Sequence, residues 1–184
     1  MSESQACSTV EHLKWTLAMD WSTISGGRPL QPGWEQRTTM WRDGQDGTPA
    51  WVASLTPLQT PSWRALQQAH GAAGLATGFR TAETSHGTNR YGWYENLERR
   101  VVRKLDVDGT NEASPMARAI RGFLDIIHVH PFTDGNTRAG CTWLIWSLVG
   151  SDLNVPDLAP LLQLPKPAGD DAVPARMADV LLSQ

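Results

Sequence analysis

The stretch that determines the fold is residues 114–150, SPMARAIRGFLDIIHVHPFTDGNTRAGCTWLIWSLVG. Ser114 followed by Pro115 is a helix-start signal, because a capping hydroxyl precedes a proline at the first helical position. Apolar residues then recur at helical spacing, at Met116, Ile120, Phe123, Leu124 and Ile127. This helix must stop before Pro131, and a second helix is expected over residues 137–149. The stretch therefore predicts two helices joined by a short polar loop.

The polar loop, residues 130–138, reads HPFTDGNTR and carries residue types that bind phosphate groups. The following helix begins with unpaired N–H groups, and Gly135 lets successive N–H groups turn into one concavity. Arg138 adds a planar set of donors suited to phosphate oxygens. Asp134 supplies a hard carboxylate oxygen, best explained by Mg²⁺ held between it and phosphates. His130, with an ordinary pKa of about 6.5, is a candidate general base for a hydroxyl nucleophile.

This loop resembles the signature loop of the Fic/Doc (Fido) family, His-x-Phe-x-Asp/Glu-Gly/Ala-Asn-x-Arg. The matching positions are His130, Phe132, Asp134, Gly135, Asn136 and Arg138. Upstream, residues 114–129 resemble the helix that precedes the family's loop. Residues 78–81, Gly-Phe-Arg-Thr, are similar to the start of its β-hairpin flap. The resemblance covers about residues 60–150.

The resemblance implies a mostly α fold, a Fic-like helical core with a small β-hairpin flap, within one domain spanning residues 1–184. It implies a nucleotide-dependent transferase that modifies a Ser, Thr or Tyr hydroxyl of a protein target. The reaction most often found in the family is AMP transfer from ATP, or protein adenylylation. Mg²⁺ would be the cofactor and ATP, or another nucleoside triphosphate, the substrate.

Individual roles also follow from the resemblance. His130 would deprotonate the target hydroxyl, Asp134 would hold Mg²⁺, and Phe132 would anchor the loop in the core. The nucleotide's phosphates would bind to backbone N–H groups and to one side chain, at Gly135, Asn136, Thr137 and Arg138. The flap, roughly residues 79–90, would pin the target segment as an added strand. Its candidate target-binding residues are Phe79, Arg80, Thr81 and Arg90.

Two positions depart from the family's adenylylating pattern, which has Gly where Thr137 stands and a second Arg where Cys141 stands. The Doc branch also lacks both residues and resembles a kinase that passes on the γ-phosphate. A Doc-like phosphotransferase is therefore an alternative. A catalytically weakened nucleotide-binding or toxin-like interaction module, or an enzyme acting on a small-molecule hydroxyl, also stays open. The family's inhibitory helix pattern is absent, so a separate antitoxin-like inhibitor is a possible partner.

Structural explanations compete with these roles. Asp134 and Asn136 are also good helix caps, and Arg138 and the flap arginines are also candidates for ion pairs. His128 and His130 form a His-x-His pair, but residues i and i+2 of a helix end do not share a face, so zinc is not favoured. A helix carrying Arg99, Arg100, Arg103 and Lys104 is expected to present a solvated basic face, with an acidic partner as the alternative. Cys141, Trp143 and Trp146 are expected to be buried.

Residues 1–60 are rich in Trp and in turn signals, with one short helix expected at 10–20 and a strand or two within 39–52. Val10, Leu13 and Leu17 would share the inner face of that helix. Six of nine Trp residues precede or border the Fic-like region: Trp15, Trp21, Trp34, Trp41, Trp51 and Trp63.

Further helices are expected at 63–72, capped by Ser62, and at about 94–105. The Pro-rich tail, residues 151–184, would pack on the core, with a last helix at 175–182.

Composition restricts the remaining function classes. The 184 residues include 16 Lys and Arg against 19 Asp and Glu, giving a net charge of −3, whereas a dedicated nucleic-acid-binding domain is usually basic. No run of about 18 apolar residues predicts a membrane span, and the first residues lack the pattern of a signal peptide. Cys7 and Cys141 are too few and too far apart to indicate a disulfide framework. A cytoplasmic protein with no membrane or direct nucleic-acid partner is expected.

Overall fold

A computed structural model describes residues 9–32, 61–87, 89–108 and 113–183. This part of the chain folds into seven helices and one antiparallel pair of short strands, which confirms the mostly α prediction. The elements are α1 (Thr9–Ala18), α4 (Trp63–Ala72), β1 (Thr84–His86), β2 (Asn89–Tyr91), α5 (Leu97–Asp108), α6 (Pro115–Val129), α7 (Asn136–Val149), α8 (Ala159–Gln163) and α9 (Val173–Leu182). The strands expected within 39–52, and Trp34, Trp41 and Trp51, lie outside the described residues.

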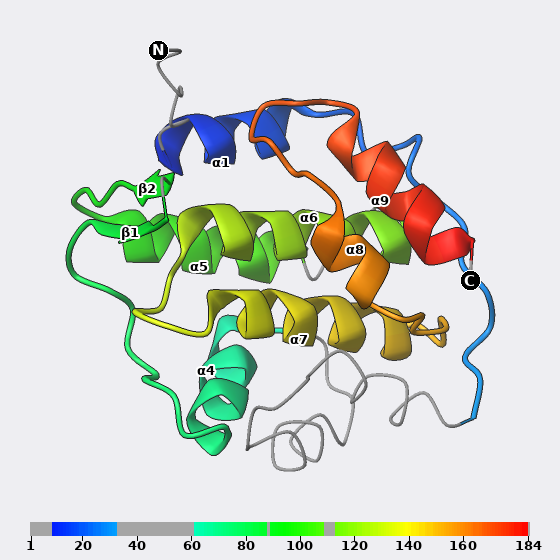
Figure 1. Ribbon diagram of the computed structural model, residues 1–184, viewed down its shortest axis with the longest axis horizontal. Helices are drawn as coiled ribbons and strands as arrows, with labels where there is room; N and C mark the ends of the chain where they lie inside the picture. Colours follow the sequence, from blue (N-terminus) through cyan, green and yellow to red (C-terminus); the bar gives the residue numbers. More distant parts are fainter. Residues whose placement is uncertain (1–8, 33–60, 88, 109–112, 184) are drawn as a thin grey trace.

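Helices α6 and α7 form the centre of the molecule and run antiparallel to each other (Figure 1). Their close approach depends on Gly122 of α6, since a Cβ built there would lie 1.9 Å from Nε1 of Trp143 on α7. Trp143 is 1% exposed, and Cys141 and Trp146 are buried with it, as the sequence predicts. The two helices therefore bury one another's inner faces and form the support for the loop that joins them.

The predicted helix starts agree closely with the structure. The Ser114 hydroxyl accepts a hydrogen bond from the Ala117 N–H at 3.1 Å, and Ser62 caps α4 through the Ala65 N–H at 3.2 Å. Helix α5 is the exception, because it begins at Leu97 rather than near residue 94. Asn96 has a left-handed backbone, with φ of 67°, and this conformation interrupts a helix at that point.

The other helices cover this central pair (Figure 1). Helix α1 packs on α6, α4 packs on α7 and α5, and α9 packs on α6 and α8. The tail is also tied to the N-terminal part of the chain, because Leu153 and Pro29 form an isolated antiparallel bridge. The last helix begins at Val173, two residues earlier than expected. None of the described helices is long and apolar enough to cross a lipid bilayer.

The inner face of α1 differs from the prediction. Leu13 is buried at 6% exposure, but Leu17 is 61% exposed, so its assignment to the inner face is wrong. Among the described side chains of α1, Thr9, His12 and Thr16 are buried beside Leu13; the side chain of Val10 lies outside the described part of the structure. Polar side chains take the inner face because they reach a buried carboxylate on α6, which an apolar pattern does not reveal.

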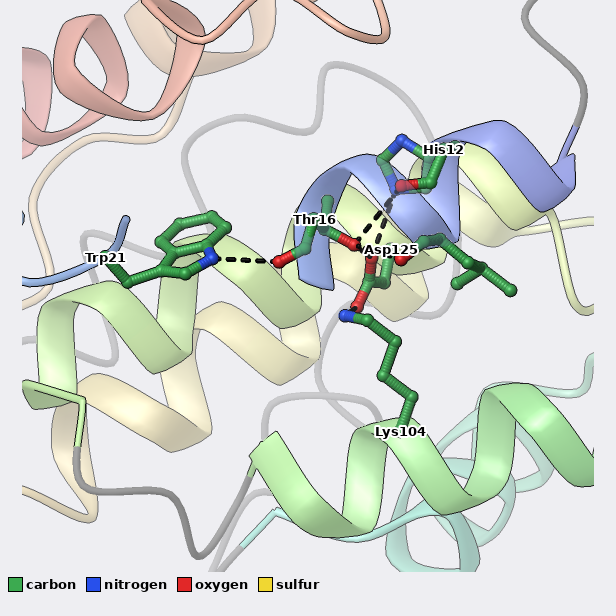
Figure 2. A network of polar contacts seen from close by, with 6 residues as sticks. His12, Thr16, Trp21, Lys104 and Asp125 are labelled. Atoms are coloured by element: carbon green, nitrogen blue, oxygen red, sulfur yellow. Dashed lines mark hydrogen bonds and ion pairs between the residues drawn. The ribbon is translucent and has the colours of Figure 1, made fainter. Parts of the chain in front are cut away.

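That carboxylate belongs to Asp125, which is 1% exposed and lies between α1 and α5 (Figure 2). Its Oδ1 is 3.1 Å from Nε2 of His12 and accepts a hydrogen bond from the Thr16 hydroxyl at 2.9 Å. Its Oδ2 pairs with the ammonium of Lys104. Lys104 is 6% exposed, so its placement on a solvated basic face is wrong; Arg99, Arg100 and Arg103 are exposed as expected. A buried charge is tolerated only when it is paired, and here Asp125 supplies the pair.

Candidate active site

A cavity of about 750 Å³ opens where the α6–α7 loop, the β-hairpin and the segment after α8 meet. The loop contributes His130, Thr133, Asp134 and Gly135, and the first turn of α7 contributes Asn136, Thr137 and Arg138. The structure thus brings the catalytic, metal-binding and phosphate-binding candidates of the sequence to one cavity. The hairpin's Arg90 lines it as well, while Phe79, Arg80 and Thr81 do not.

His130 ends α6 in a left-handed conformation, with φ of 51° and ψ of 63°. Its backbone N–H still donates to the Ile126 carbonyl at 3.0 Å, so the residue is held as the helix cap. Burial, with smaller contributions from His86 and Arg80, lowers the pKa of the imidazole to about 4. The ring is consequently neutral near pH 7, which is the protonation state that a general base requires.

The β-hairpin lies beside the loop and covers His130. Strands β1 and β2 pair with Thr84 opposite Tyr91, which confirms the two extended arms expected around Gly87. The Tyr91 ring stacks on the His130 ring with 3.5 Å between centroids and 10° between planes. Sequence reasoning missed Tyr91 as a site residue. Only the β-pairing register brings it over the loop, and no spacing along the chain indicates this.

Arg80 holds the hairpin and the start of the α6–α7 loop together. Its guanidinium is buried and donates to four backbone carbonyls: from Nε to His130 at 2.6 Å, from Nη1 to Ala82 at 2.6 Å, and from Nη2 to Gly92 at 2.6 Å and Val129 at 3.0 Å. Four of its five N–H groups are used in this way. The assignment of Arg80 to target binding is therefore wrong, and Arg80 is a positioning residue.

The other flap candidates occupy different surroundings. Phe79 is half-buried and contacts Trp63, with 5.7 Å between ring centroids. Thr81 is exposed, and Arg90 is exposed and pairs weakly with Glu83 at 3.7 Å. Arg90 is thus the flap residue among these candidates that both lines the cavity and remains accessible to a ligand.

Phe132 and Asn136 fix the shape of the loop. The Asn136 side chain accepts the Phe132 N–H through Oδ1 and donates to the Phe132 carbonyl through Nδ2, both at 2.9 Å. The Phe132 ring is fully buried and stacks between His70, at 3.9 Å, and Trp63, at 5.1 Å. The side chain of Asn136 therefore shapes the loop through both of its polar atoms.

Gly135 turns the chain into α7 with a φ of 72°, a left-handed conformation that favours glycine. A Cβ at this position would lie 2.7 Å from both Nε2 of His70 and Cδ1 of Leu75. Asp134 precedes it, and its Oδ1 accepts the Gly135 N–H at 2.6 Å while Oδ2 lies 3.8 Å from Arg138. Gly135 is the N-cap residue of α7 and no side chain caps this helix, so Asp134 is not its cap; it presents its carboxylate just before the helix N-terminus.

The geometry agrees with the comparison to known proteins. The family model of the Fic/DOC family matches residues 62–148, from the cap of α4 to the last turn of α7. Over this segment the chain is similar to the Fic/DOC family. A comparison with curated proteins gave no match. The Fic/DOC family generally comprises transferases, and at that level the chain is a transferase-like Fido-domain protein.

The Fic/DOC segment does not account for the whole cavity. His12 of α1 and Lys166, which follows α8, also line it, and both lie outside residues 62–148. His128 lines the same wall and its ring centroid is 4.4 Å from that of His12. Burial lowers the pKa of His128 to about 3, so this imidazole is neutral at pH 7 as well. Sequence reasoning did not single out His12 or Lys166, since both come from the parts of the chain with the weakest patterns.

Asp134 is suited to the Mg²⁺ that the Fic/DOC resemblance implies. Its carboxylate is exposed beside the N-terminus of α7, and Mg²⁺ is commonly held by one or two carboxylates together with substrate phosphates and water. Within the described residues there is no group of three or more His, Cys, Asp or Glu side chains that could hold a metal ion by itself. A metal at Asp134 would therefore depend on a phosphate-bearing ligand.

Proposed function

We propose that the chain is a Mg²⁺- and nucleotide-dependent transferase that modifies the hydroxyl of a protein Ser, Thr or Tyr. The observation that carries this proposal is the convergence of His130, Asp134 and Arg138 on one cavity, at the N-terminus of α7. A base, a hard carboxylate, a helix N-terminus and a guanidinium are the parts that transfer of a phosphate-containing group needs.

His130 would act as the base. Its imidazole takes the hydroxyl proton while the hydroxyl oxygen forms a bond to phosphorus. The pKa of about 4 reflects burial under the hairpin without a ligand, and a base that weak transfers protons inefficiently. Phosphate charges in the cavity would favour the protonated imidazole and raise this pKa toward the working range. Substrate binding would thereby activate the base.

Phosphate binding would fall to the start of α7. The N–H groups of Asn136 and Thr137 lie in its first turn, where helix N-termini attract anions, and Arg138 adds charge-assisted hydrogen bonds. Mg²⁺ held by Asp134 would neutralise phosphate charge as the transferred group moves. Thr137 is exposed on the cavity wall, so its branched side chain borders the space that the phosphates would use.

Adenylyl transfer from ATP is our first choice for the reaction. The target oxygen would bond to the α-phosphorus and the bond to the bridging oxygen would break, releasing pyrophosphate. The second candidate is Doc-like transfer, in which the oxygen bonds to the γ-phosphorus and ADP leaves. The second candidate is favoured by Thr137 and Cys141, the two departures from the adenylylating pattern.

The target segment would bind along the hairpin. Strands β1 and β2 are three residues each and largely exposed, and an extended peptide would pair with an outer edge of this hairpin. Arg90 on β2 is exposed, lines the cavity and would contact the target. A separate antitoxin-like protein is proposed as a possible inhibitor.

Incubation with labelled ATP tests the proposal and separates its two versions. The chain, a cell lysate and Mg²⁺ are incubated with ATP labelled at the α- or the γ-phosphate, using wild type, His130→Ala and the control Lys14→Ala, an exposed residue that does not line the cavity. Label transferred only from the α-phosphate establishes adenylylation, and label only from the γ-phosphate establishes phosphorylation. Absence of His130-dependent label from either position overturns both versions for ATP.

A further inference from the structure

Lys166 brings a positive charge to the cavity from outside the Fic/DOC segment. It lies in the segment between α8 and α9, which runs from α8 toward α1 before it enters α9 (Figure 1), and it lines the cavity together with Leu162 and Leu164. The family match ends at residue 148, so nothing in that match assigns Lys166 a role.

The chain holds the ammonium of Lys166 in place. Its Nζ donates to the Leu164 carbonyl at 2.7 Å and to the Leu162 carbonyl at 3.3 Å, at the end of α8. The same nitrogen lies 6.0 Å from the centre of the Phe123 ring, which also lines the cavity. An ammonium has three N–H groups, so one donor remains after the two carbonyl bonds. A lysine pinned in this way loses less conformational freedom on binding a ligand than a mobile surface lysine does.

The charge of Lys166 is not balanced by a carboxylate. Among the described residues it forms no salt bridge, and the carboxylate that lines the cavity, Asp134, lies near Arg138 instead. Burial lowers the pKa of Lys166, as expected for a half-buried cation without an anionic partner. The cavity wall therefore holds a fixed cation whose partner would be supplied by a ligand.

Lys166 lines the same cavity as Arg138 of α7. Arg138 and Lys166 thus place two positive charges on the wall of one cavity, Arg138 in the first turn of α7 and Lys166 in the segment after α8. A single phosphate at the helix N-terminus would engage the first charge, and a longer phosphate chain would reach the second.

We propose that Lys166 binds a second phosphate group of the ligand held at the N-terminus of α7, and so selects nucleoside di- and triphosphates over monophosphates. This inference rests on the proposed nucleotide-binding function. It names the residue that distinguishes ligands with two or three phosphates from those with one. The carbonyl bonds and the Phe123 contact hold the ammonium, and its third N–H donates to the phosphate.

Calorimetric titration tests this selection. Wild type, Lys166→Gln, Lys166→Arg and the control Lys14→Gln are titrated with AMP, ADP and a non-hydrolysable ATP analogue in the presence of Mg²⁺. Lys14 is an exposed lysine on α1 that does not line the cavity. We expect Lys166→Gln to weaken triphosphate binding by about tenfold or more, since hydrogen bonds to charged groups contribute that much. Binding of AMP should change less than twofold, and Lys166→Arg should recover most of the loss.

The outcomes separate this inference from the proposed function. If wild type binds the triphosphate and Lys166→Gln binds it equally well, the inference is wrong and the proposed function stands. If Lys166→Gln weakens the binding of AMP and of the triphosphate equally, Lys166 only stabilises the end of α8. That result also overturns the proposed selection of longer phosphate chains. Thermal unfolding of each variant shows whether the α8 end remains intact. A wild-type protein that binds none of the three nucleotides overturns the proposed function itself, and the inference with it.

Discussion

The phenol ring of Tyr91 lies parallel to the imidazole of His130, with 3.5 Å between their centroids. Tyr91 comes from the end of β2, and His130 caps α6, so the contact joins the flap to the catalytic loop. Tyr91 is itself half-buried, and burial raises the pKa of its phenol. One face of the candidate base is therefore shielded from water by a side chain of the segment that would receive the target.

Replacing Tyr91 with Leu should raise the pKa of His130 toward about 6.5, since the stacked ring contributes to the burial that lowers it to about 4. An NMR titration of the imidazole resonances measures this change directly. Tyr91→Phe keeps the ring and serves as the control, with a pKa near the wild-type value. If the Leu variant titrates like wild type, the stacked ring does not control the basicity of His130.

The lowered pKa values of His128 and His130 predict that stability falls with acid. His128 and His130 have folded pKa values of about 3 and about 4, below the unfolded value of about 6.5. The unfolded chain therefore binds more protons between these limits, and stability is lost as the pH falls from about 6.5 toward 3. Each such histidine costs up to about 1.4 kcal/mol per pH unit within its window.

Urea unfolding of wild type and His128→Asn between pH 7 and pH 4 checks this slope. The Asn variant should lose part of the pH dependence, because the buried titrating group is removed. Exposed His86 provides the comparison, and His86→Asn should leave most of the slope in place. A variant lacking His128 that shows the full wild-type slope would assign the acid sensitivity to other groups.

Arg80→Lys should destabilise the protein by about 2 to 4 kcal/mol and reduce transferase activity. A lysine has three donors and no planar fork, so it cannot satisfy the carbonyls of Ala82, Gly92, Val129 and His130 together. Chemical denaturation and the rate of label transfer provide the two measurements. The exposed Arg64→Lys on α4 is the matched control, and both variants behaving alike would contradict the positioning role of Arg80.

Much of the fold and the catalytic loop could be predicted because the signals are local. The Ser114 and Ser62 caps, the periodic stripe of α6 and the loop residues 130–138 each depend on positions a few residues apart. The structure places His130, Asp134 and Arg138 around one cavity, as the loop pattern indicates.

The rest depends on contacts between segments distant in sequence. The sequence pattern predicts that Lys104 is an exposed cation on a polar helix face. Only the packing of α5 on α6 shows that Lys104 pairs with Asp125. Arg80 likewise looks like a flap arginine until the carbonyls of the α6 end surround it. Lys166 follows a short helix with almost no periodic signal. Spacing along the sequence cannot predict the roles of such residues, because tertiary structure determines their partners.

Asp125→Ala should destabilise the protein by about 3 to 5 kcal/mol, because it removes the buried carboxylate that pairs with the buried ammonium of Lys104. Burial raises the pKa of Asp125, but the charge of Lys104 and the hydrogen bond with His12 outweigh it and hold that pKa below its usual range. Denaturant titration gives the free energy of unfolding, with exposed Asp179→Ala as the control. The double variant Asp125→Leu, Lys104→Met should recover part of the loss; no recovery would argue against the broken ion pair as the cause.

Gly122→Ala tests the crossing of the two central helices. The new Cβ would lie 1.9 Å from Nε1 and 2.5 Å from Cδ1 of the fully packed Trp143 ring, so the helices must move apart or the ring must leave its site. We expect a loss of about 3 kcal/mol or more in the free energy of unfolding, at the high end for an overpacked core. Gly78→Ala is the control, since a Cβ there meets nothing within 4 Å. Combining Gly122→Ala with Trp143→Leu removes the clash, so the pair should be less destabilised than the sum of the two single variants. Simple additivity would mean that the glycine is required for a reason other than the approach of Trp143.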